Sequence, residues 1–138
     1  MLDGKFNQQK ADAFAEGLMD ILNKGAIALS ISVGHRTGLF DAMKTLPPAT
    51  SAQIAEAAEL DERYVREWLG AMVTGRVVCF NPEKHTYRLA DEHAAYLTRD
   101  AAPNNLAALM QYIPLLGSVE DKIVACFKNR SEERRVGK

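Results

Sequence analysis

The segment from Thr50 to Leu89 constrains the fold of this chain more than any other part of the sequence. Its first part predicts two short helices joined by a tight turn. Thr50 and Gln53 have the spacing of a capping box at the start of the first helix, and Asp61 is suited to cap the second. Leu60 is the turn residue between them. A helix, a short turn and a second helix in this order form a helix-turn-helix unit.

The second part of this segment predicts the end of the second helix and a β-hairpin. Gly75 is suited to a left-handed cap at the end of that helix. Val77–Phe80 is rich in β-branched and aromatic residues, and Thr86–Leu89 alternates as a half-buried strand does. The apolar stripe expected on the second helix consists of Tyr64, Val65, Trp68, Leu69 and Met72. The whole pattern predicts a winged helix-turn-helix.

The N-terminal part predicts a long helix that begins near Phe6. Between Gly25 and Val33 its apolar residues spread around most of the circumference, so this part must be covered on most sides. We expect a break at residues 23–25 and burial against a second copy of the chain; burial within one chain is the alternative. The residues proposed for the interface between copies are Leu22, Ala26, Ile27, Leu29 and Ile31.

The C-terminal part predicts further helices: one from Asp91, one over residues 105–113 that ends before Pro114, and one capped by Ser118. The expected fold is mainly α-helical with one small β-hairpin. A long N-terminal helical pair precedes the winged helix-turn-helix, and two or three helices follow it. The expected units are N-terminal dimerisation helices (1–46), a winged-helix core (47–97), linker helices leading to a missing catalytic domain (98–129) and a terminal tail (130–138).

The polar face of the second helix carries no net charge, which argues against DNA binding. Glu62 and Glu67 offset Arg63 and Arg66 on this face. Residues 1–129 carry 13 Lys and Arg against 16 Asp and Glu, a net charge of −3. Proteins that bind DNA need an excess of basic residues, because phosphate neutralisation supplies most of the affinity. We therefore expect no nucleic-acid partner and no attraction to anionic membranes.

The cysteines and the N-terminus indicate a cytoplasmic protein. Cys79 and Cys126 lie far apart and belong to no C-x-x-C pair, so we expect two buried, reduced thiols. The N-terminus lacks the apolar core of a secretory signal, and polar residues interrupt the most apolar stretch of the chain.

His35, His85 and His93 share no spacing typical of metal ligands, so no metal site is expected.

Four segments, in this order, resemble class I S-adenosylmethionine-dependent methyltransferases that begin with a winged helix. The matching segments are Gly34–Ala42 (GHRTGLFDA), Pro48–Ala55, Leu60–Leu69 and Tyr87–Ala94. The resemblance implies that the winged helix mediates homodimerisation and helps to roof the pocket of a small-molecule acceptor. It also implies that S-adenosylmethionine binds a following Rossmann-like domain of the full-length protein.

The resemblance carries no catalytic or cofactor-binding residue onto this chain. Such enzymes hold the methyl donor with a glycine-rich loop, and no two glycines here have Gly-x-Gly spacing. We therefore expect no bound donor and no activity from these residues alone. The candidates for the substrate-pocket roof are His35, Arg36, Met110 and Tyr112. Their ordinary alternatives are a solvated turn for Arg36, a hydrogen bond to a neighbouring carbonyl for His35, and packing for Met110 and Tyr112.

The tail suggests why the sequence would stop before such a domain. Arg130–Lys138 resembles the translation of a common sequencing adapter, so we expect native sequence to end near Asn129. Resequencing the locus tests this expectation. The sequence thus predicts the dimerisation and substrate-capping portion of a methyltransferase. The alternative is a winged-helix transcription regulator that binds DNA.

Overall fold

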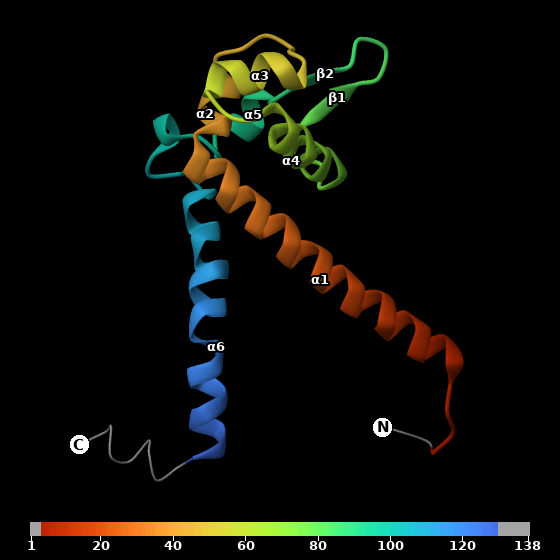
Figure 1. The fold of residues 1–138 in the computed structure, drawn as a ribbon. Helices are drawn as coiled ribbons and strands as arrows, with labels where there is room; N and C mark the ends of the chain where they lie inside the picture. The colour runs from red at the N-terminus through yellow and green to blue at the C-terminus, as the bar shows by residue number, and fades with distance from the viewer. Residues whose placement is uncertain (1–3, 130–138) are drawn as a thin grey trace, which may run out of the picture.

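The computed structural model describes residues 4–129, which form a winged-helix head with two long helical arms (Figure 1). The N-terminal arm is α1 (Gln8–Thr37) and the C-terminal arm is α6 (Tyr112–Lys128). The arms leave the head next to each other and then diverge (Figure 1). The expected tail, residues 130–138, lies outside the described residues.

Helix α1 is continuous, so the break expected at residues 23–25 is wrong. The side chain of Asn7 accepts a hydrogen bond from the backbone N–H of Lys10 and caps its start. A glycine inside a helix costs only about 1 kcal/mol, and Gly25 is too weak a breaker to end this one. The helix ends at Gly38, whose φ of 78° is the left-handed conformation that favours glycine. The short α2 (Leu39–Lys44) follows at once.

The helix-turn-helix consists of α3 (Ser51–Ala58) and α4 (Glu62–Thr74). The predicted capping box is present, because the backbone N–H of Gln53 donates to Thr50 Oγ1 at 3.2 Å and that of Thr50 donates to Gln53 Oε1 at 2.9 Å. Asp61 caps α4 as predicted. The left-handed cap predicted at Gly75 is wrong, since Gly75 has φ −79° and the left-handed residue is Arg76, with φ 63°.

The wing is the antiparallel hairpin β1 (Cys79–Asn81) and β2 (Thr86–Arg88), in which Phe80 pairs with Tyr87. Ala49 adds one bridge to the other side of Tyr87. The predicted strand began earlier, at Val77. The backbone N–H groups of Val77 and Val78 donate instead to the carbonyl of Met72, at 2.8 and 3.2 Å. These bonds close the end of α4, so the strand starts only after them.

The C-terminal part consists of α5 (Asp91–Ala94), the 3₁₀ turns η1 (Arg99–Ala101) and η2 (Ala108–Gln111), and α6. Two predictions here are wrong. Pro114 does not end a helix, because it lies in the first turn of α6, where backbone N–H groups have no intrahelical partner to lose. Ser118 does not cap a helix, because it lies inside α6 and donates to the carbonyl of Leu115 at 2.7 Å.

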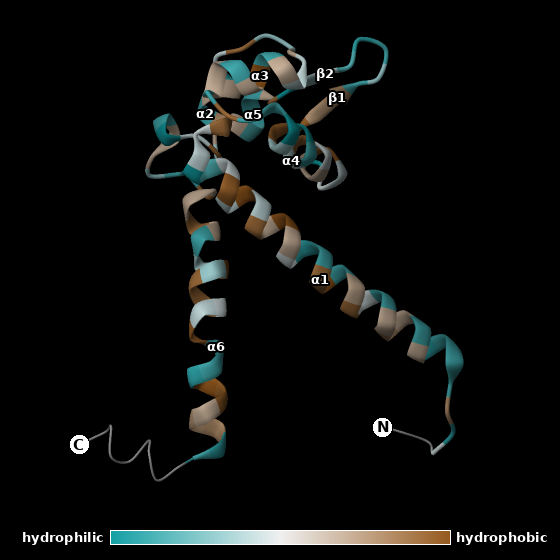
Figure 2. Cartoon of the chain, viewed as in Figure 1, coloured by the Kyte–Doolittle hydropathy of each residue, from teal (hydrophilic) through white to brown (hydrophobic). Residues whose placement is uncertain are grey.

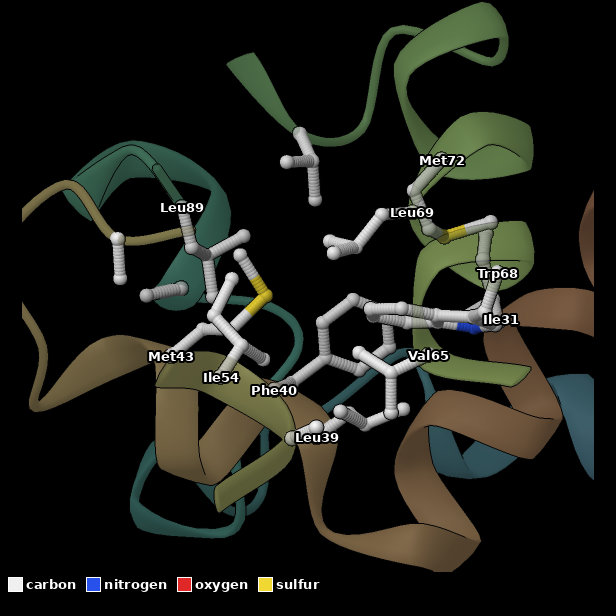
Figure 3. Close-up of a cluster of buried hydrophobic side chains, with 14 of the residues drawn as sticks. Ile31, Leu39, Phe40, Met43, Ile54, Val65, Trp68, Leu69, Met72 and Leu89 are labelled. Carbon is white, nitrogen blue, oxygen red and sulfur yellow. The ribbon is translucent and has the colours of Figure 1, made fainter. Parts of the chain in front are cut away.

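The hydrophobic core lies where α1, α2, α3 and α4 meet (Figure 3). Gly34 lets α1 approach closely, since a Cβ there would lie 2.5 Å from Trp68 Cζ2 and 2.6 Å from Phe40 Cε2. The residues in this core that Figure 3 labels are Ile31, Leu39, Phe40, Met43, Ile54, Val65, Trp68, Leu69, Met72 and Leu89. Tyr64 is not among them: it is 68% exposed, so its predicted place in the apolar stripe is wrong. Burial of Cys79 and Cys126 is also wrong, since both are exposed.

The predicted fold class is confirmed as mainly α-helical with a small hairpin in a winged helix-turn-helix. Both arms carry apolar residues along surfaces that this chain leaves open (Figure 2). Within residues 4–129, no helix combines the length and apolar character that crossing a membrane requires.

Candidate functional site

The outer face of α4, which reads DNA in winged-helix regulators, has its basic groups paired with acidic ones. Arg63 Nε lies 3.9 Å from Glu67 Oε1, and Arg66 Nε lies 3.7 Å from Glu62 Oε2. Ser51 Oγ also donates to Glu62 Oε2 at 2.6 Å and holds this carboxylate at the start of α4. The structure thus preserves the neutral face that the sequence predicts.

The wing adds little positive charge. Lys84 lies in its loop and Arg88 at the end of β2, both exposed, with Glu83 beside Lys84. A salt-sensitive DNA complex typically involves about six to ten phosphate contacts. The outer face of α4 and this hairpin together do not supply that many basic side chains.

His35 is the candidate roof residue with the most defined surroundings. Its Nδ1 lies 3.4 Å from Asn105 Nδ2, while Asn105 Oδ1 accepts from the backbone N–H of Ala107 at 2.9 Å. The amide oxygen is therefore engaged, and the amide nitrogen faces an imidazole nitrogen that must act as the acceptor. Burial lowers the pKa of His35, the nearby Arg99 charge lowers it further, and Asp41 partly offsets both. A neutral imidazole fits this contact.

The other three roof candidates lie in different settings. Met110 is partly buried and packs against the hydrophobic core from η2. Arg36 is exposed near the end of α1, and Tyr112 is exposed at the start of α6. Tyr112 borders an open hollow with Ala108, Gln111 and Leu115. The region where α1 packs on η2 thus contains His35 and Met110, whereas Arg36 and Tyr112 face solvent beside it.

Sequence reasoning missed an ion pair that fixes this region. Asp41, in the first turn of α2, accepts a hydrogen bond from the backbone N–H of Arg99 at 2.8 Å. Its second carboxylate oxygen accepts from Arg99 Nη1. Lys44 and Asp100 form a second, longer pair at 3.5 Å between the same segments. Together these contacts hold the segment that leads to η2 against α2.

The five residues proposed for the interface between copies divide into two groups. Leu22, Ala26 and Leu29 are exposed on α1. Ile27 is half-buried and lies over Gly75, and Ile31 is 8% exposed in the core of its own chain. Because Ile31 already packs within this chain, it is removed from the proposed interface.

The described residues do not fit a site for a nucleoside cofactor or a metal. The strands in residues 4–129 form the wing hairpin, and no glycine-rich loop joins either of them to a helix. Within the same residues, no group of three or more His, Cys, Asp or Glu side chains could hold a metal ion. No chemical step is therefore assigned to these residues.

The chain belongs to the family of Rv2258c-like winged helix-turn-helix domains, whose family model matches residues 25–99. The match covers the end of α1, the helix-turn-helix, the wing and α5. No curated protein sequence matches the chain.

Solved structures of methyltransferases share the fold. Human N-acetylserotonin methyltransferase in complex with SAM is 17% identical, with a TM-score of 0.59 over 83% of this chain and 32% of its own. PigF with SAH is 22% identical, with a TM-score of 0.60 over 87% and 34%. The mitomycin 7-O-methyltransferase MmcR is 23% identical, with a TM-score of 0.63 over 74% and 30%. The chain therefore spans about a third of the length of these structures, and at these identities the likeness concerns the fold.

Proposed function

We propose that this chain is the dimerisation and substrate-capping portion of a methyltransferase that acts on a small molecule. S-adenosylmethionine would bind a part of the full-length protein outside these residues. The observation that carries the proposal is the neutral outer face of α4, in which both arginines are paired with glutamates. A winged helix with such a face is better suited to contact protein than a polyanion.

The exposed apolar residues of the arms support dimerisation. Every residue of α1 up to Lys24 is exposed except the half-buried Ala11, and this part includes Phe14, Leu18 and Leu22. Exposed apolar surface of this extent marks a contact with another protein. A homodimer built on α1 would cover it, as the resemblance also implies.

The junction of α1 and η2 is the proposed roof of the acceptor pocket. His35 and Met110 lie at this junction, and Tyr112 borders the hollow next to it. These groups would shape the upper wall of the acceptor pocket and exclude water from it. The donor-binding part would form the opposite wall. The protein's contribution to such a methyl transfer is mainly positioning. We place the protein in the cytoplasm, where exposed free cysteines stay reduced.

Calorimetric titration of the chain with S-adenosylmethionine tests the proposal that the methyl donor binds outside these residues. We expect no saturable heat up to millimolar donor, and micromolar binding would contradict the proposal. Reading the gene beyond codon 129 provides a second test. We expect a glycine-rich strand–loop–helix within the next hundred or so codons, and its absence from the genomic sequence would remove the methyltransferase assignment.

Binding to DNA is the second candidate function, because the fold is that of a helix-turn-helix family. A mobility-shift assay on mixed duplex DNA at low salt distinguishes the two. The methyltransferase proposal predicts no retardation. Clear retardation that weakens steeply with added salt would instead favour a regulator.

A further inference from the structure

The free side of α1 carries a row of exposed residues that is symmetrical about its own middle. Leu22 and Leu29 lie at equal distances on either side of the Gly25–Ala26 bond, and Leu18 and Val33 lie at equal distances further out. The row follows i, i+4 and i+3 steps, so its members share one side of the helix. All four leucine and valine side chains of this row are between 44% and 64% exposed.

This symmetry suits an antiparallel pairing of two identical helices, because apolar residues then meet apolar residues on both sides of the axis. In a two-fold dimer each contact occurs twice, so a residue on one side of the axis meets its counterpart from the other side. An axis at Gly25–Ala26 would place Leu22 of one copy near Leu29 of the other. The smallest residues of the row would then lie where the helices cross. A Cβ at Gly25 would meet nothing within 4 Å, so the crossing point is open.

The same row leads into an apolar hollow at the junction of α1 and α4. The walls of this hollow include Val33, Thr37, Leu60, Tyr64, Val65 and Trp68. Its volume is about 210 Å³. A benzene-sized ring fits a cavity of about 150 Å³, so a phenyl side chain fits here.

One aromatic residue has the right position in the row to reach this hollow. Phe14 lies four residues before Leu18, just as Thr37 lies four residues after Val33, and so these two are also counterparts about Gly25–Ala26. Phe14 is 69% exposed on the part of α1 that projects from the head. Rows of i+4 contacts cross obliquely when two helices pack. A second helix laid along this row would therefore pass over the hollow with its N-terminal half.

We propose that two copies of this chain cross at Gly25–Ala26 with antiparallel α1 helices, and that Phe14 of each copy fills the hollow of the other. The inference rests on the proposed homodimer and adds its register and its anchoring residue. The two hollows are equivalent, so the dimer has two such anchors. The apolar walls are otherwise left partly open, with Tyr64 at 68% and Val33 at 44% exposure.

The fluorescence of Trp68 tests the anchor. Trp68 is the only tryptophan of the chain and lines the hollow, where its Nε1 donates to the carbonyl of Ser30 at 2.8 Å. We expect acrylamide to quench Trp68 less as the full chain is concentrated from monomer to dimer. Phe14→Ala should abolish this change and weaken the dimer roughly a hundredfold, about tenfold for each of two anchors. The control is Phe6→Ala, since Phe6 is 80% exposed and precedes the helix.

Cysteine crosslinking tests the register on a background in which Cys79 and Cys126 are replaced by serine. Ala26→Cys should join two copies through a short bismaleimide, because residue 26 lies next to the two-fold axis. Lys24→Cys is the matched control: residue 24 is exposed at nearly the same height of α1, and at about 3.6 residues per turn it lies on nearly the opposite side of the helix from residue 26.

The outcomes separate the inference from the proposed dimer. A dimer in sedimentation that crosslinks at residue 26 and not at residue 24, with Trp68 protected by Phe14, supports the register and the anchor. A dimer that crosslinks only at residue 24, or that Phe14→Ala leaves intact, overturns this inference and keeps the homodimer. A chain that remains monomeric at high concentration overturns both.

Discussion

Gly34→Ala provides a direct test of the packing between α1 and the head. A Cβ at this position would lie 2.5 Å from Trp68 Cζ2 and 2.6 Å from Phe40 Cε2, so one ring must move by about 1 Å to restore a normal contact. Neither ring is free to move. Phe40 is 1% exposed, the two rings pack edge to face at 5.2 Å, and Trp68 is tied to Ser30 by its hydrogen bond.

Two opposing terms set the size of this effect. Forced overpacking of a core costs about 1–3 kcal/mol. Replacing a helical glycine by alanine stabilises the helix by up to about 1 kcal/mol. For a site with two immobile rings we take the upper part of the first range, so Gly34→Ala should lower the free energy of unfolding by about 1–2 kcal/mol.

The assay is urea unfolding at one fixed protein concentration, because dimerisation would shift the midpoint. Gly70→Ala is the matched control, since Gly70 is exposed inside α4 and a Cβ there would meet nothing within 4 Å. It should raise stability by about 0.5–1 kcal/mol. If Gly34→Ala raised stability as much as Gly70→Ala, the close approach of α1 to the two rings would be refuted.

Three further predictions concern single contacts. Asp41→Asn should lower the free energy of unfolding, measured in urea, by about 1–2 kcal/mol, because it weakens two hydrogen bonds from the partly exposed Arg99. An unchanged midpoint would show that the Asp41–Arg99 pair does not stabilise the fold. Thr50→Ala should cost about 1 kcal/mol in the same assay through the lost cap of α3, whereas Thr50→Ser should cost little. An NMR titration should give His35 a pKa below 6.5. Because the folded pKa lies below the unfolded one, the contribution of His35 to the free energy of unfolding is present above the unfolded pKa and is lost as the pH falls through 6.5 towards the folded pKa. His35→Gln should remove this part of the pH dependence of the free energy of unfolding.

Features set by neighbouring residues could be predicted from the sequence. The capping box of Thr50 and Gln53 depends on residues three positions apart, and Asp61 caps the helix that it precedes. The hairpin likewise follows from two short β-rich runs and the turn between them. Each of these needs only local spacing, which a single sequence displays.

Features set by distant residues could not be predicted in this way. The Asp41–Arg99 pair joins residues 58 positions apart, and the contact of His35 with Asn105 spans 70. Tyr64 has the same helical spacing from Trp68 as a core residue would, yet only the packing of α1 decides which side of α4 is covered. The expected break in α1 failed for a related reason, since α1 runs on past Gly25 until Gly38 turns the chain.

The projecting part of α1 yields a last prediction, which separates a helix stable by itself from one that needs a partner. Residues 8–24 lie almost wholly in solvent, and most of the stability of a helix in a protein comes from tertiary packing of its apolar face rather than from its intrinsic propensity. Gly17 destabilises this part of the helix by up to about 1 kcal/mol. The exposed pair of Asp20 and Lys24, at 2.9 Å, stabilises it by only about 0.3–0.5 kcal/mol.

Amide hydrogen exchange should therefore be fast over residues 8–24 at low protein concentration and slow once the chain dimerises. Residues 28–37 pack on the head and should exchange slowly at both concentrations. If the amides of residues 8–24 exchanged as slowly at concentrations where sedimentation shows only monomer as they do in the dimer, a second copy would not be what stabilises this helix. The exposed row on α1 would then have to be explained by another partner.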